Sequence, residues 1–143
     1  KLGNGWDDKP KKGSKYSIFS FLDLIKESLI INKETQRKYY ISHTGKKDKN
    51  NSYNIRRYDP ETDTYSKCLF AVDNKQVDMA TFCNPSDKKQ EWSIHFSSGD
   101  KKELYVKSEY NGKYLMFDIN SNDYMEQLTT SRNKYTTFII NKN

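Results

Sequence analysis

Long apolar runs, histidine and cysteine are all scarce in this sequence. No apolar run approaches the ~20 residues that a membrane-spanning helix needs, so we expect no membrane span. The 143 residues include only two cysteines and two histidines. Two cysteines without a nearby histidine do not make a closed zinc site, and we expect neither a metal ion nor another cofactor.

Motifs for catalysis are missing as well. No paired carboxylates, catalytic triad or phosphate-binding glycine loop stands out from the sequence. His43 and His95 fall on predicted strands one register apart, so they should point to opposite faces and not converge. A Cys–His nucleophile is therefore not expected, and we predict that the protein is not an enzyme.

The sequence is rich in charged and aromatic residues. Charged residues make up 31% of the chain and hydrophobic residues only 34%. Eleven Tyr, seven Phe and two Trp can still build a core, because each buries a large area. The length is that of one ordinary domain. The formal net charge of +6 favours contact with anions, although it also serves solubility.

One pattern repeats three times along the chain. Residues 17–41, 68–94 and 114–140 each run from an apolar strand through a turn, a second strand and a polar loop to an aromatic residue two positions before isoleucine. The final isoleucines lie 94 − 41 = 53 and 140 − 94 = 46 residues apart, so the period is about fifty. The aromatic residues in register are Tyr39, Trp92 and Phe138.

Four short strands fit each repeat, which predicts an all-β protein with the β-trefoil fold. In this fold three four-stranded repeats form a six-stranded barrel capped by three hairpins, and closure removes exposed sheet edges. We expect a single domain over 1–143, with repeats at about 1–44, 45–98 and 99–143. The poorly defined first strand is assigned to residues 2–6. The strands predicted in the later repeats are 53–55, 69–72, 77–82, 92–96, 104–106, 115–117, 124–128 and 137–140.

One segment favours a different structure. Leu22, Ile25 and Leu29 have helical spacing, and Ser20 with Asp23 resembles a capping box. The β-branched pair that follows, at positions 30 and 31, continues the repeat as a strand. We follow the repeat and predict a strand here, with a helix as the alternative.

The second repeat carries the most specific pattern in the chain. Cys68-Leu-Phe-Ala-Val-Asp73 is followed by Cys83 and then by Gln90-Glu-Trp92-Ser-Ile94. This pattern closely resembles one repeat of the ricin B-type β-trefoil family. The resemblance implies a disulfide between Cys68 and Cys83 across a hairpin, and a Gln-x-Trp that packs the fourth strand into the core. A disulfide fits a secreted, extracellular protein, whereas two buried free thiols are the alternative.

The resemblance also implies where a sugar binds. In sugar-binding members an Asp two residues after the first Cys accepts from sugar hydroxyls, an aromatic residue two before the second Cys stacks on the ring, and an Asn precedes Gln-x-Trp. These positions depart from the pattern here, because they hold Phe70, Thr81 and Lys89. The corresponding residues of the third repeat are Met116, Gln127 and Tyr135.

If the family's sugar-site pattern is shifted by one residue along this sequence, other side chains of the same hairpin fall at the sugar-binding positions. The sugar site would then use acid, amide and aromatic groups near the two cysteines. The alternative is that these residues only build the hairpin. The candidate ligand-binding residues are Asp73, Asn74, Phe82 and Asn84.

Turns that join a fourth strand to the next first strand should gather at the open end of the barrel. A basic pole at that end can hold a sulfated or phosphorylated polymer through salt-sensitive contacts, or it can be a set of solvated loops. Arg56 and Arg57 would add bidentate donors if they face the same way. The candidate lysines are Lys46, Lys47, Lys101 and Lys102.

These observations predict a secreted, non-enzymatic binding module of the lectin-like β-trefoil type. The expected partner is a glycan or an anionic polymer, and nucleic acid is not expected. The alternative is a protein-interaction trefoil, either cytokine-like or a subunit of a toxin or another complex, that binds a protein partner without binding sugar.

Overall fold

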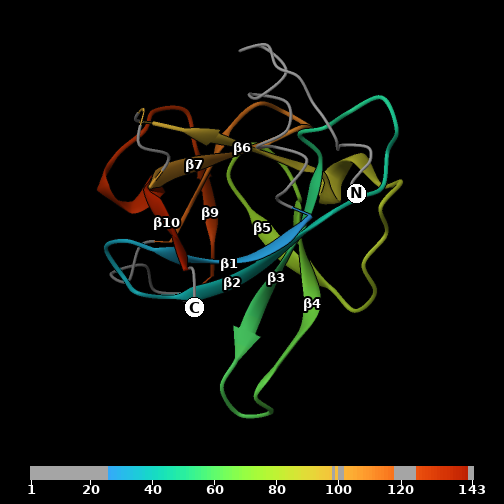
Figure 1. Ribbon diagram of the computed structural model, residues 1–143, viewed down its shortest axis with the longest axis horizontal. Coiled ribbons are helices and arrows are strands. Elements are labelled where there is room, and N and C mark those ends of the chain that lie inside the picture. The colour runs from blue at the N-terminus through green and yellow to red at the C-terminus, as the bar shows by residue number, and fades with distance from the viewer. Residues whose placement is uncertain (1–25, 98, 100–101, 118–124, 142–143) are drawn as a thin grey trace, which may run out of the picture.

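The backbone closes a six-stranded barrel, as the repeat predicts. A computed structural model describes residues 26–97, 99, 102–117 and 125–141. Each barrel strand pairs antiparallel with the next, and β10 pairs with β1, so the ring is complete (Figure 1). The predicted all-β class and β-trefoil fold are confirmed. The barrel strands are β1 (Glu27–Asn32), β2 (Lys38–His43), β3 (Tyr53–Asp59), β6 (Trp92–Phe96), β7 (Glu103–Ser108) and β10 (Phe138–Asn141).

Two hairpins extend from the barrel in the described part of the chain. β4 (Thr64–Ala71) pairs with β3 and with β5 (Val77–Ala80), and β8 (Tyr114–Met116) pairs with β7 and with β9 (Gln127–Thr129). The turn between β3 and β4 projects at the bottom of Figure 1. Two single-turn 3₁₀ helices, η1 (Lys88–Gln90) and η2 (Lys134–Thr136), precede the fourth strands of the last two repeats.

The first repeat shows only two strands among the described residues. β1 lies in the barrel between β2 and β10, and a connection of residues 33–37 leads directly to β2, where each later repeat inserts a hairpin. The Asn32 side chain holds this connection: its Oδ1 accepts from two backbone N–H groups of the turn at 3.1 Å, and its Nδ2 donates to the Tyr135 carbonyl at 2.8 Å. Residues 2–6, the predicted first strand, lie outside the described residues, and β1 occupies the position assigned to them.

The strand interpretation of the ambiguous segment is confirmed where the structure describes it. Ile30 and Ile31 belong to β1 and pair with Tyr39 and Lys38 of β2. Residues 20–25, which carried the capping-box pattern, lie outside the described residues. The β-branched pair therefore predicted the local structure of residues 27–32.

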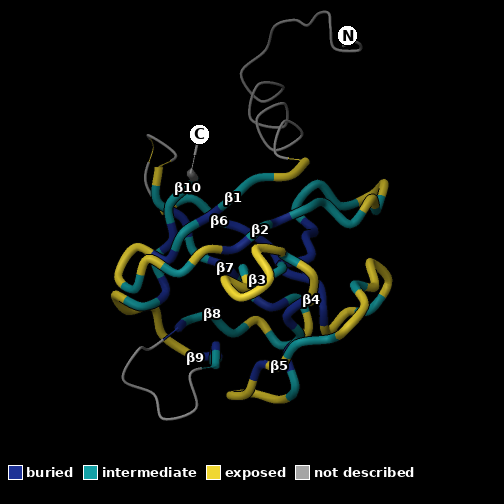
Figure 2. Tube along the Cα trace, turned by 90° about the horizontal axis from the view of Figure 1, so that it is seen from below, coloured by how far each residue is buried: buried dark blue, intermediate teal, exposed yellow. Residues whose placement is uncertain are grey.

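The core fills the inside of the barrel. Burial alternates along the strands, as in β7, where every second residue is buried, and Figure 2 shows buried segments at the centre and exposed turns at the rim. Tyr39, Trp92 and Phe138, the aromatic residues in register, are all fully buried. The rings of Tyr39 and Phe138 meet edge to face with their centroids 5.7 Å apart. Their burial explains how a sequence low in aliphatic residues fills a barrel.

Candidate functional site

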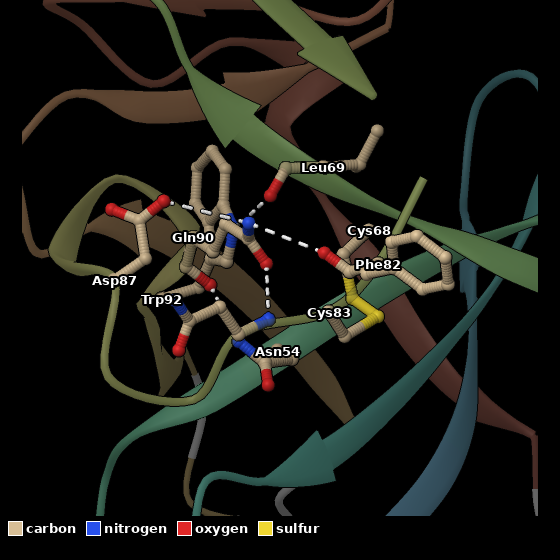
Figure 3. The surroundings of a disulfide bond; sticks show 9 residues. Asn54, Cys68, Leu69, Phe82, Cys83, Asp87, Gln90 and Trp92 are labelled. Atoms are coloured by element: carbon tan, nitrogen blue, oxygen red, sulfur yellow. Dashed lines mark hydrogen bonds between the residues drawn. A yellow bond between two sulfur atoms is a disulfide. The ribbon is translucent and has the colours of Figure 1, made fainter. Parts of the chain in front are cut away.

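The predicted disulfide links strand β4 to the segment that follows strand β5 (Figure 3). Cys68 lies on β4 and Cys83 follows β5, with their Cα atoms 5.2 Å apart. Cys68 is opposite Ala80 in the hairpin register, which brings the chain beyond β5 back to Cys68. The bond therefore anchors the start of the loop that leads to η1 and β6.

The Gln-x-Trp motif fixes the rest of that loop. Gln90 Oε1 accepts from the backbone N–H of Asn84 at 2.8 Å, and Gln90 Nε2 donates to the Phe82 carbonyl at 3.5 Å and to Asp87 Oδ2 at 3.4 Å (Figure 3). Trp92 Nε1 donates to the Leu69 carbonyl at 3.1 Å. These bonds and the disulfide hold the loop while leaving the Phe82 side chain 83% exposed.

The candidate sugar residues of the second repeat do not come together. Asp73 and Asn74 form the tip of the β4–β5 hairpin, whereas Phe82 and Asn84 lie beyond its opposite end. Cys83, between Phe82 and Asn84, has its Cα atom 5.2 Å from that of Cys68, and the hairpin tip lies beyond the end of β4, so the two pairs are roughly 15–20 Å apart at about 3.3 Å per residue. Asp73 Oδ1 accepts from the N–H groups of residues 75 and 76, both at 2.8 Å, and these bonds lower the pKa of its carboxyl. The shifted site is therefore divided between two surfaces.

The predicted basic pole is also arranged differently. Lys46 Nζ lies 2.8 Å from Glu91 Oε1, and Lys49 Nζ lies 3.0 Å from Glu91 Oε2 and 2.9 Å from Glu109 Oε1. Lys47 and Lys102 are exposed, and Lys101 lies outside the described residues. The lysine at position 46 is thus paired with a buried carboxylate, while its side chain stays 35% exposed.

Glu91, the middle residue of Gln-x-Trp, is the carboxylate that these lysines neutralise. Its side chain is buried, and its Oε2 also accepts from Ser52 Oγ at 2.7 Å. Burial alone would raise the pKa of the Glu91 carboxyl, but hydrogen bonds from Lys46, Ser52 and Lys49 outweigh it and lower the pKa to about 2. Glu91 is therefore a structural anion that ties the β2–β3 loop to the start of β6.

A second buried carboxylate lies beneath the hairpins. Glu126 Oε2 accepts from the Tyr39 hydroxyl at 2.7 Å and lies 3.9 Å from Arg37, while Glu126 Oε1 lies 3.7 Å from Arg57. Burial, and next the charge of Glu126, raise the pKa of Tyr39 well above its ordinary value. Arg57 also donates to Met79 Sδ at 3.0 Å. This arginine, a candidate donor to an external anion, is thus used inside the protein.

A polar cleft of about 750 Å³ lies between the β4–β5 and β8–β9 hairpins. The hairpins are tied together by the Leu128 N–H, which donates to the Lys75 carbonyl at 2.9 Å, and by a β-bridge between Gln76 and Gln127. Asn111 Nδ2 also donates to the Asp73 carbonyl at 3.0 Å. The side chains that line the cleft carry amides, hydroxyls, carboxylates and ammonium groups; they include Asn74, Lys75, Gln76, Asp78, Lys113, Gln127, Thr129 and Thr130.

Sequence reasoning identified only part of this cleft. Asn74 was a candidate for the second-repeat sugar site, and Gln127 was noted at the ring-stacking position of the third repeat; both line the cleft. Lys113 and Thr129 carried no such signal, because only the folded chain brings the two hairpins together. Across the described ranges, no group of three or more His, Cys, Asp or Glu residues is placed to hold a metal ion. In the same ranges no helix is long and apolar enough to cross a membrane.

Comparison with known proteins supports the fold and leaves the ligand open. No protein-family model and no curated protein matches the chain. Among solved structures, SeviL bound to asialo-GM1 saccharide is 18% identical, with a TM-score of 0.54 over 82% of this chain and 97% of that chain. The BEL β-trefoil is 10% identical, with a TM-score of 0.57 over 94% of this chain and 97% of that chain. The cytolethal distending toxin of Haemophilus ducreyi is 10% identical, with a TM-score of 0.54 over 93% and 88%.

The closed barrel, the capping hairpins and these likenesses define the class: the protein has the β-trefoil fold. Its second repeat has the disulfide and the buried Gln-x-Trp that the family resemblance implies. At these levels of identity the likeness establishes the fold alone.

Proposed function

We propose that this protein is a lectin-like, non-enzymatic binding module that takes a glycan in the cleft between its two hairpins. The cleft is the observation that carries the proposal. Its volume of about 750 Å³ is in the range of small-ligand sites, ~300–1,000 Å³, and its amide, hydroxyl and charged groups match the hydrogen-bonding groups of a saccharide. SeviL, with the same fold, is described bound to a saccharide.

We also propose that the protein is exported from the cell. The Cys68–Cys83 disulfide supports this, because such bonds persist in oxidising compartments and are rare in the cytosol. Intact mass with and without reductant, followed by alkylation of protein isolated from its native source, tests the proposal. Alkylation of both cysteines without reduction would contradict it.

A glycan array followed by titration of the strongest hit tests the binding function. Replacing two exposed cleft residues together, Asn74→Ala with Asp78→Ala, should lower affinity at least tenfold, because each removes hydrogen bonds that fix the sugar. The control pair, Asn84→Ala with Glu61→Ala, removes one amide and one carboxylate from exposed positions outside the cleft. Equal losses of affinity in both double variants would refute the cleft as the binding site, and an array without any hit would refute glycan binding in the cleft.

Protein interaction is the second candidate function, and one observation favours it. Phe82 is 83% exposed although the disulfide and Gln90 hold its loop in place. A fixed, exposed aromatic ring is typical of an interface anchor, because little conformational entropy is lost when it enters a pocket. If a partner binds here, Phe82→Ala should abolish a co-purified complex and leave glycan binding unchanged. Persistence of the complex in this variant would exclude Phe82 as its anchor.

A further inference from the structure

An aromatic row crosses the outer face of β6, β7 and β8. Tyr105 and Lys107 point outward from β7, since the residues beside them, at positions 104 and 106, are buried in the core. In the strand registers His95 is opposite Tyr105, and Tyr114 is opposite Lys107. Three neighbouring strands therefore present aromatic and basic side chains side by side. We call this surface, with the Arg132 side chain above it, the ladder face.

Ring contacts make the ladder face rigid. His95 stacks on Tyr105 with centroids 5.2 Å apart and planes 17° apart, and Tyr105 meets Tyr114 at 5.5 Å. The Arg132 guanidinium carbon lies 4.3 Å from the Tyr105 centroid, and Lys107 Nζ lies 5.6 Å from the Tyr114 centroid. Both distances are within the ~6 Å of a cation–π contact, so the rings hold the cations in position.

The two cations of the ladder face remain available to an anion. Within the described residues, neither Arg132 nor Lys107 has a carboxylate oxygen at ion-pair distance, in contrast to Lys46 and Lys49. A guanidinium that lies flat on a ring keeps its N–H edges free, and these edges match the oxygens of a carboxylate or sulfate. The ladder face therefore has fixed positive charge without a counterion among the described residues.

A groove of about 560 Å³ borders the ladder face and is lined by Ser93, His95 and Lys107 together with the β2–β3 loop. Ser93 Oγ and His95 Nε2 are 2.8 Å apart. Two acids also line the groove, Asp48 and Glu109, and Glu109 is paired with a lysine at 2.9 Å. An acidic ligand is thus directed toward the Lys107 side, while the groove, whose lining combines apolar surface with hydroxyl and amide groups, can accept its ring.

We propose that the ladder face is a second binding site, separate from the cleft, that takes a sulfated or carboxylated saccharide unit. The acidic group lies between Arg132 and Lys107, and the sugar ring enters the groove beside His95. Fixed rings, cations held over them and a groove of small volume fit one or two sugar rings better than an extended acidic peptide, which needs a longer surface. The proposal rests on the proposed function only in taking a saccharide as the ligand.

Titration calorimetry with a heparin tetrasaccharide tests the site, with an unsulfated tetrasaccharide of the same backbone and an acidic hexapeptide as comparisons. We expect Arg132→Ala with Lys107→Ala to weaken binding of the sulfated probe about tenfold or more and to flatten its salt dependence. The matched control, Lys67→Ala with Lys88→Ala, removes two exposed lysines outside the ladder face and should change affinity less than about twofold. Arg132→Lys keeps the charge but loses the planar stack, and should bind less tightly than the native protein.

The outcomes separate this site from the cleft. Loss of heparin binding in the ladder variants, with array binding intact, supports two sites; the same loss with an empty array supports the ladder face and refutes the cleft. Equal losses in the ladder and control pairs, no binding of the sulfated probe, or equal affinity for the acidic hexapeptide would each overturn the ladder-face proposal.

Discussion

Acid should destabilise this protein through one carboxylate, Glu91. The Glu91 side chain is buried, and its oxygens contact Lys46, Lys49 and Ser52 at 2.8, 3.0 and 2.7 Å. Protonation removes the negative charge that both lysines neutralise and leaves part of a buried polar network without its partners. Lowering the pH therefore tests this prediction, and the variant Glu91→Gln separates the contribution of the Glu91 carboxylate from that of the other acids.

The size and direction of the effect follow from the pKa of Glu91. Its ordinary value of 4.5 falls to about 2 in the folded protein, a difference of 4.5 − 2 = 2.5. At about 1.4 kcal/mol per pKa unit this corresponds to about 3 kcal/mol, an upper bound because the lysine partners are partly exposed to salt and water. A lowered carboxyl pKa contributes stability above pH 4.5, and this contribution is lost as the pH falls from 4.5 through 2.

Urea unfolding followed by tryptophan fluorescence, from pH 7 to pH 2, measures the effect, since Trp92 is buried in the core. The free energy of unfolding of Glu91→Gln should lie below that of the native protein at pH 7, and the gap should close toward pH 2. The matched control is Glu103→Gln, which breaks the exposed pair with Lys33 and should change stability by about 0–1 kcal/mol at all pH values. Parallel pH profiles for the native protein and Glu91→Gln would refute the reasoning.

Three further changes test other parts of the structure by the same unfolding assay. Replacing Cys68 and Cys83 by Ser should lower stability by about 3 kcal/mol, as expected for a closed loop of this size, and a stability equal to that of the oxidised protein would contradict this. Gln90→Ala removes the side chain that bonds three positions of the preceding loop and should lower the free energy of unfolding by about 1–3 kcal/mol, whereas an unchanged midpoint would show that the disulfide alone holds the loop. Tyr39→Phe removes the hydroxyl that donates to the buried carboxylate of Glu126 and should lower the free energy of unfolding by a similar ~1–3 kcal/mol. An unchanged free energy of unfolding would contradict this role of the hydroxyl.

The second repeat could be predicted closely because its signals are local. Cys68, Cys83, Gln90 and Trp92 lie within one stretch of chain, and each meets its predicted partner or enters the core. The first repeat offered weaker local signals. Among its described residues a turn held by Asn32 stands between β1 and β2, where the later repeats have a hairpin, and no composition signal separates such a turn from the polar loops of the other repeats.

One lysine of the predicted basic pole has an internal partner that the sequence did not indicate. Lys46 was interpreted as part of a basic pole, but its partner Glu91 is 45 residues away in the chain and is brought to it by the fold. The variable middle position of Gln-x-Trp gave no indication that it holds a buried charge. Likewise Arg132 and Tyr105 come together only after β7 and the loop before η2 are in place. Long-range contacts of this kind cannot be deduced from local spacing.

The pairing of β1 with β10 has a kinetic consequence. Leu29 is opposite Asn141, so the contact that completes the ring joins positions 141 − 29 = 112 residues apart. Contacts between residues far apart in the sequence slow folding, because the chain must lose the entropy of the intervening loop before the favourable strand pairing forms. The β4–β5 hairpin, by contrast, pairs residues only a few positions apart and can form early. Folding of this β-trefoil should therefore be limited by docking of β10 onto β1 and β7, and chains that wait at this step carry two unpaired strand edges on which other chains can nucleate aggregation.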